Sequence, residues 1–193
     1  MYRIVFCILC ALFLCTCRQE ENTKVYVRIV GGEEQVSTVL RVGERSFSLV
    51  LDSIGEAEID LFFLTEVSEG VLRHGRYELP LFFEPNQSFE VFINLDSNDF
   101  GAEFNGEGAL KNEIWNSELF SPFPDSVFRL EEIAFGRFVG QKRLQLKTCM
   151  DFGEQNDSLF KAKIQERLEE LLLKEVSSYS ERHTNKANES VKD

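Results

Sequence analysis

The side chains most able to do chemistry are the cysteines, which fall into two groups along the chain. Cys7, Cys10, Cys15 and Cys17 all lie near the start, whereas Cys149 stands alone far along the chain. A thiolate can act as a nucleophile or bind a metal. The Cys7–Cys10 spacing is that of a redox motif, but the pair lies inside an apolar run and is explained as part of a cysteine-rich leader.

The sequence around Cys17 is typical of an exported protein. Arg3 is the only charge before Cys17, and Ile4 to Leu14 is unbroken apolar chain. Such a stretch is a secretory signal and is too short to span a bilayer as a mature helix. Leu14-Cys15-Thr16-Cys17 resembles a bacterial lipobox, which implies a diacylglycerol on the Cys17 sulfur and cleavage before it. We expect a signal peptide over residues 1–16, the alternatives being cleavage elsewhere or an uncleaved anchor.

Cleavage before Cys17 would also determine the thiol content and the charge of the exported chain, residues 17–193. Cys149 would be its only thiol, so no intramolecular disulfide could form. Of the 21 Lys and Arg side chains only Arg3 lies in the leader, whereas all 33 Asp and Glu side chains follow it. An acidic protein repels phosphate backbones, so we expect no nucleic-acid partner.

Residues 17–23 are predicted to be the lipidated cysteine and a polar, flexible tether. Glu20 and Glu21 follow closely on Cys17 and resemble the signal that sends some Gram-negative lipoproteins to the outer membrane. We therefore expect an exported protein that Cys17 anchors to a membrane, with the outer membrane as the expected location. Whether it faces the periplasm or the cell surface is left open.

Residues 24–104 have the alternation of half-buried strands. Val25, Val27 and Ile29 alternate with polar or larger side chains early in the segment, and Phe89-to-Leu95 repeats the pattern late in it. Glu84-Pro85-Asn86-Gln87 is a turn signal between two such strands. Short strands with tight turns predict an antiparallel β-sandwich or a small barrel.

Residues 105–182 are predicted to form three helices that pack on the sandwich. The first runs from about Ala109 to Leu119, the second begins at Asp125 or Ser126, and Asp157 or Ser158 caps the third. The third has an apolar stripe at helical spacing: Phe160, Ile164, Leu168, Leu171, Leu172, Val176 and Tyr179. The polar residues 183–193 are predicted to be disordered.

Two short runs resemble a known family. Leu81-to-Val91, followed by Phe104-Asn105-Gly106-Glu107-Gly108-Ala109-Leu110-Lys111-Asn112, resembles the β-rich leader domain of thioredoxin-like lipoproteins. In that family a small β-sandwich is joined to helices and then to a thioredoxin domain. The resemblance implies the sandwich and the helices. The family's active-site cysteine pair has no counterpart in this sequence, so its redox activity is not implied.

Other constellations are better explained structurally. His74 and His183 are too few for a metal site, and Asp96-to-Glu107 departs from a calcium loop because Phe100 replaces an oxygen ligand. Asp52-Ser53, Asp125-Ser126 and Asp157-Ser158 resemble O-glycosylation triplets, yet each also suits a turn or a helix cap. Phe62, Phe82 and Phe92 alternate with the core series, and we expect helices to cover them rather than an exposed, sugar-stacking face.

These observations predict an α+β protein, an antiparallel β-sandwich followed by three C-terminal α-helices. The expected function is that of a membrane-anchored lipoprotein with a non-enzymatic binding or accessory role. We identify no catalytic residue, metal ligand or cofactor site, and Cys17 is the only modification site. The alternatives are an accessory domain that docks a separate thioredoxin-like oxidoreductase, and a carbohydrate-binding surface lipoprotein. A protein partner in the cell envelope fits the first two hypotheses.

Overall fold

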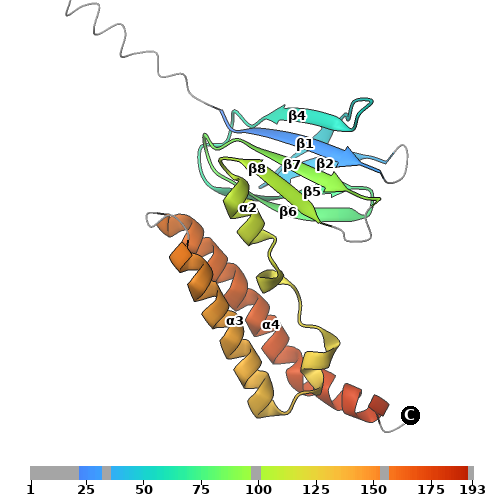
Figure 1. The fold of residues 1–193 in the computed structure, drawn as a ribbon, viewed down its shortest axis with the longest axis vertical. Helices are drawn as coiled ribbons and strands as arrows, with labels where there is room; N and C mark the ends of the chain where they lie inside the picture. The colour runs from blue at the N-terminus through green and yellow to red at the C-terminus, as the bar shows by residue number, and fades with distance from the viewer. Residues whose placement is uncertain (1–21, 32–35, 97–100, 153–156, 191–193) are drawn as a thin grey trace, which may run out of the picture.

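The computed structural model describes residues 22–31, 36–96, 101–152 and 157–190. These residues form a β-sandwich followed by α-helices, as predicted (Figure 1). The strands are β1 (Lys24–Val30), β2 (Thr38–Val42), β3 (Arg45–Leu49), β4 (Glu56–Asp60), β5 (Ser68–His74), β6 (Tyr77–Phe83), β7 (Phe89–Asn94) and β8 (Ala102–Gly106). The helices are α2 (Ala109–Trp115), α3 (Glu132–Phe152) and α4 (Ser158–Ser190), with 3₁₀ helices η1 (Glu118–Phe120) and η2 (Asp125–Arg129) between α2 and α3.

The sandwich consists of two four-stranded sheets. Their strand orders are β4-β1-β7-β8 and β3-β2-β5-β6. The strand pairs are antiparallel except β1 and β7, which run parallel with Val27 opposite Val91. Parallel neighbours need a long crossover, and here the intervening chain supplies it by forming β4 and the whole second sheet. This parallel pair is the one departure from the predicted antiparallel pairing.

Alternating side chains build the sandwich core. In β7 the burial alternates strictly, with Phe89, Val91 and Ile93 buried, because successive side chains of a strand point to opposite faces. The buried core contains Val25, Val27, Ile29, Leu40, Val42, Leu61, Leu64, Leu72, Leu79, Leu81, Phe83, Phe89, Val91, Ile93 and Phe104. The inner faces of the two sheets therefore enclose a largely aliphatic interior.

Helix α2 protects the open edge of the second sheet. The Asn112 side chain receives a hydrogen bond from the Phe82 backbone N–H and donates one to the Phe82 carbonyl, both at 2.9 Å. One turn later, Asn116 donates to the carbonyl of Pro80 at 2.9 Å. An unpaired strand edge invites aggregation unless it is covered. The two asparagine side chains thus take the place of a neighbouring strand along β6.

A second hydrophobic core lies outside the sandwich. We call α3, α4 and the segment 116–131 the helical arm. Its core also includes Phe82 of β6, and its buried members are Phe82, Trp115, Leu119, Phe123, Val127, Phe128, Phe135, Val139, Leu146, Phe160, Ile164, Leu168 and Leu172. Figure 1 shows α3 and α4 side by side, extending well beyond the sandwich. The expected packing of residues 105–182 on the sandwich is therefore restricted to α2 and the near end of the arm.

The structure corrects three further details of the predicted helices. A 3₁₀ helix occupies residues 125–129, and α3 begins only at Glu132. Val176 is 45 % exposed, and Glu175 is the buried residue at that level of the stripe. Helix α4 extends to Ser190, past residue 182, where the sequence predicts its end. The near part of this extension is held in place, because His183 Nδ1 lies 2.8 Å from the Phe128 carbonyl oxygen and hydrogen-bonds to it.

Across the described part of the chain, none of the helices combines the length and the apolar character that crossing a bilayer requires.

Candidate functional site

The predicted lipidation site lies outside the described residues. Cys17, the signal peptide and most of the tether belong to residues 1–21. The lipidation of Cys17 and the membrane location that depends on it therefore stay predictions. The candidate site that the structure offers lies instead where the sandwich meets the helical arm.

A cavity of about 560 Å³ lies at this junction, and we call it the junction cavity. The turn between β6 and β7, helix α2, the end of α3 and the start of α4 all contribute to it. Its lining residues are Pro85, Asn86, Gln87, Glu107, Leu110, Lys111, Ile114, Cys149, Met150, Asp157, Phe160, Lys161 and Ile164. Small-molecule sites typically have 300–1,000 Å³ and favour boundaries between structural units. The junction cavity meets both criteria.

Lys111 is the ionic centre of this junction. Its ammonium group forms ion pairs with Glu84, which follows β6, and with Asp157, which precedes α4. The three side chains are largely buried, with exposed fractions of 18 %, 12 % and 20 %. Burial alone would lower the pKa of Lys111, but hydrogen bonds to Asp157 and Glu84 outweigh it and raise the pKa. Lys111 thus stays charged and links the elements that enclose the cavity.

Asp157 combines two structural tasks. Its Oδ1 atom accepts a hydrogen bond of 2.9 Å from the Phe160 backbone N–H, which makes it the N-cap that the sequence predicts for α4. Burial would raise the pKa of Asp157, but the hydrogen bonds from Lys111 and Phe160 outweigh that effect and lower it. The carboxylate therefore remains ionised, and it fixes the start of α4 at the wall of the cavity.

The polar lining of the cavity has one unsatisfied acceptor. Gln87 Oε1 is shielded from water and receives no hydrogen bond. The preceding Asn86 has a φ of 64°, in the left-handed region that the turn signal predicts for Asn. Gln87 lines the cavity together with the apolar side chains of Leu110, Ile114 and Phe160. A buried acceptor without a donor costs free energy, so an apolar ligand with an N–H or O–H group would complement this site.

The structure separates the other residues that the sequence analysis considered. His74 is buried at the far end of the sandwich, within 2.8 Å of Thr38 Oγ1, and His183 lies in the helical arm. No cluster of three or more His, Cys, Asp or Glu side chains suited to a metal occurs within the described ranges. Residues 97–100 of the calcium-like segment lie outside those ranges.

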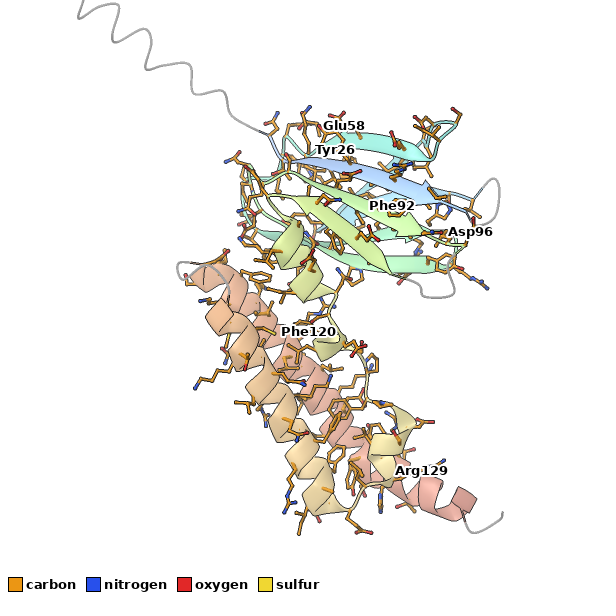
Figure 2. The ribbon with its side chains drawn as sticks, viewed as in Figure 1. Tyr26, Glu58, Phe92, Asp96, Phe120 and Arg129 are labelled. Atoms are coloured by element: carbon orange, nitrogen blue, oxygen red, sulfur yellow. The ribbon has the colours of Figure 1, made fainter. Side chains whose placement is uncertain are left out.

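The three outward-alternating phenylalanines have different environments. Phe82 is buried beneath the helices as expected, with its ring centroid 4.9 Å from that of Phe160. Phe62 is 73 % exposed, so the expected cover is wrong there. Phe92 is partly buried on the outer face of its sheet, where Figure 2 shows it near Tyr26, and the Arg28 guanidinium lies 5.6 Å from its ring centroid. Phe82 belongs to the second sheet, whereas Phe92 belongs to the first and Phe62 follows β4, so the helices cover only one of the three side chains.

Sequence reasoning missed the junction cavity because distant segments build it. Glu84, Lys111 and Asp157 are brought together only by the folded chain, although each lies in a segment that the sequence analysis had identified as a turn, a helix or a cap. The signal that could have pointed to the site is Asn112, the last residue of the family-like motif, because its side chain holds α2 on β6.

Comparisons with known proteins give the chain no family. No protein-family model matches it, and no curated protein does. Among solved structures, the N-terminal domain of AlgF from P. aeruginosa is similar over 45 % of this chain and 94 % of its own, with 12 % sequence identity and a TM-score of 0.33. A similarity at this level supports neither a fold assignment nor a function.

Proposed function

We propose that the protein is an exported lipoprotein, anchored through Cys17, that binds an apolar ligand or an apolar segment of a partner without catalysing a reaction. The observation that carries the binding role is the junction cavity, whose size and mixed apolar and polar walls suit a ligand. The anchoring rests on the sequence of the leader alone.

The arrangement of the elements suits a tethered binding protein. The chain enters the sandwich at the start of β1, beside the β6–β7 turn that lines the junction cavity. Thr23 Oγ1 donates a hydrogen bond to the Glu84 carbonyl, and the Lys24 backbone N–H donates one to Ser88 Oγ. A lipid on Cys17 and a short tether would hold this end of the sandwich close to the membrane. The junction cavity would then lie on the membrane-proximal side of the sandwich.

The walls of the cavity indicate the ligand's chemistry. Leu110, Ile114 and Phe160 offer apolar surface, and Gln87 Oε1 lacks a donor. A flat apolar group with a single N–H donor matches this combination, and indole is a simple probe of that kind. Burying the apolar area of such a group supplies the binding free energy. Gln87 Oε1 is shielded in the unliganded chain, so the amide would have to turn toward the ligand to accept its hydrogen bond.

The binding role can be tested through Cys149, which lines the cavity and is a free thiol. The detergent-solubilised full chain is treated with a charged thiol reagent, with and without indole, and modification is followed on the peptide that contains Cys149. We expect indole to slow the modification in a saturable way. Leu110→Asp places a charge at the cavity and should abolish the protection.

Leu144→Asp is the matched control for this experiment. Leu144 is an exposed aliphatic residue like Leu110, with exposed fractions of 64 % and 53 %, but it is not among the residues that line the cavity. Its variant should keep the protection by indole. Equal protection in both variants, or none in the unchanged protein, would contradict binding in the junction cavity.

The anchoring has a separate test. Burial of acyl chains contributes about 0.8 kcal/mol per CH₂, so two or more chains hold a protein on a membrane almost permanently. Cys17→Ser should abolish labelling by radioactive palmitate. Labelling at the level of the unchanged protein would show that Cys17 is not the lipidated residue.

A further inference from the structure

Arg167 of α4 is a partly buried cation that lacks an ion-pair partner among the described residues. Its guanidinium carbon lies 4.2 Å from the Trp115 ring centroid and 5.0 Å from that of Phe120. Figure 2 shows Phe120 beside the α3–α4 pair, just below the sandwich. Arg167 Nη1 is shielded from water and has no hydrogen-bond partner. Among the described residues, no carboxylate forms an ion pair with Arg167.

Two aromatic faces do not replace the water that this cation has lost. A guanidinium carries five N–H donors and stays charged, and burying a charge without a partner is costly. Cation–π contacts offset only part of that cost. Burial lowers the pKa of Arg167, and the charge of Glu69 only partly opposes the shift. The structure therefore holds a cation that an added anion would stabilise.

A groove connects this cation to the surface. The groove has a volume of about 470 Å³ and lies between the outer face of the second sheet and α4. It is lined by Arg41, Gly43, Glu69, Gly70, Val71, Pro80, Trp115, Lys163, Glu166, Arg167 and Glu170. It shares no lining residue with the junction cavity. An anion that enters the groove meets Arg167 together with the exposed Arg41.

The other charges of the groove favour a singly charged anion. Lys163 Nζ lies 3.6 Å from Glu69 and 3.0 Å from Glu166, so these carboxylates already have a cationic partner. Glu170 adds a further negative charge at the lining. A doubly charged phosphate is repelled more strongly by these acids than a carboxylate is. A carboxylate also matches the planar fork of a guanidinium, which can donate two parallel hydrogen bonds.

We propose that this groove is a carboxylate-binding site in which Arg167 donates hydrogen bonds to the anion and Arg41 adds charge at the entrance. The site is independent of the binding role proposed for the junction cavity. A free organic acid and the C-terminus of a peptide both present a carboxylate. The charges of the groove do not distinguish between these two sources.

The chain contains its own reporter for this site. Trp115 is the only tryptophan of the protein, and its ring lies directly under the Arg167 guanidinium. Pairing of the cation with an anion changes the electric field at the indole ring, so Trp115 fluorescence should respond to binding. The full chain in detergent is titrated at constant ionic strength with acetate, with N-acetyl-alanyl-alanine, with the C-terminal amide of that peptide, and with inorganic phosphate.

We expect acetate or the free-acid peptide to change Trp115 emission in a saturable way, and the amide to have no effect. A response to the peptide much stronger than that to acetate would identify a peptide C-terminus as the source, and equal responses would identify a free acid. Arg167→Met keeps an apolar stem and should weaken binding at least about tenfold. Arg41→Gln, at an exposed position that leaves folding intact, should weaken it less.

Three outcomes would overturn the proposal. A saturable response that persists unchanged in both Arg167→Met and Arg41→Gln would place the anion elsewhere. A response to phosphate as strong as that to the carboxylates would contradict the carboxylate assignment. The absence of any carboxylate response in the unchanged protein would leave the groove without the proposed ligand. Because Arg41→Gln does not disturb the stacking on Trp115, the test does not depend on Arg167→Met remaining folded.

Discussion

The two hydrophobic cores of this protein are built in different ways. The sandwich core is largely aliphatic, and alternation along the strands determines which side chains enter it. The core of the helical arm is rich in aromatic rings, including Phe123, Phe128 and Phe135, which come from the irregular segment as well as from the helices. Local periodicity therefore specifies the first core, whereas contacts between distant segments specify the second.

Backbone polar groups are satisfied differently as well. In the sandwich, strand ladders pair most of them. In the arm, side chains of the helices supply donors to the irregular segment: Tyr179 to the Leu130 carbonyl at 2.6 Å, and Lys142 to the Glu118 carbonyl at 2.8 Å. Buried backbone groups need such partners. The arm is thus more sensitive than the sandwich to loss of a single side chain.

The largest expected effect is the loss of a buried leucine from the arm. Leu168 is fully buried in the second core, and Leu168→Ala should lower the free energy of unfolding by about 2–5 kcal/mol because it leaves a cavity. Lys174→Ala, at an exposed position of the same helix, is the control. Chemical denaturation should separate the two variants clearly. Equal midpoints would mean that the arm core contributes little to the folded chain.

The next effect concerns the joint between the two cores. Asn112→Ala removes both hydrogen bonds to Phe82 and should cost about 1–3 kcal/mol for each buried backbone group left unpaired. Glu113→Ala, at the exposed neighbouring position, is the control. Urea denaturation followed by Trp115 fluorescence reports on the arm, because this tryptophan is buried in the second core. A variant as stable as the control would show that α2 does not depend on these bonds.

A gain in stability is expected on the outer face of α3. A Cβ atom at Gly136 or Gly140 would meet no other atom within 4 Å. Glycine inside a helix is about 1 kcal/mol less favourable than alanine. Gly140→Ala should therefore raise the thermal midpoint, and Gly136→Ala should do the same. A lower midpoint in either variant would indicate that something in solution packs closely against this face.

The smallest expected effect is a pH dependence of the free energy of unfolding that arises in the sandwich. Burial lowers the pKa of His74 in the sandwich below its ordinary value of 6.5. Below pH 6.5 the unfolded chain therefore binds more protons at His74 than the folded chain does. The contribution of neutral His74 to the free energy of unfolding is fully present above pH 6.5 and decreases as the pH falls below that value. The depressed pKa of Asp157 at the junction acts in the same direction, but only below 3.8.

Denaturation at about pH 7.5 and about pH 5.5 therefore tests the sandwich alone. The unchanged protein should lose stability between these values, and His74→Gln should lose less. A variant with the same pH dependence as the unchanged protein would assign the effect to another group.

The contrast between the cores explains what the sequence could predict. Alternation in β7 and the Pro85-Asn86 turn follow from local rules, and both were predicted. Alternation does not identify strand β5, because its burial pattern is irregular and Gly70 interrupts it. The parallel pairing of β1 with β7 was not predicted either, because the sequence of a strand does not specify which strand it pairs with.

In the arm, the predictions succeed where a cap or a stripe is local and fail where distant contacts decide. Asp157 caps α4 as its sequence indicates. The start of the second helix was misplaced because Asp125-to-Arg129 suits a 3₁₀ turn as well as an α-helix, and packing against α4 selects the former. The junction cavity and the Arg167 groove could not be predicted, because each combines segments from both regions.

Hydrogen exchange of the full chain, with and without indole, tests most directly the claim that the junction between the two regions is a binding site. We predict that indole slows exchange in the β6–β7 turn, in α2 and in the first turns of α4, which line the junction cavity. Exchange near His74 and near Tyr179 should not change, because these residues lie far from the cavity in the sandwich and in the arm. Protection confined to either of those distant regions, with none at the junction, would contradict the account.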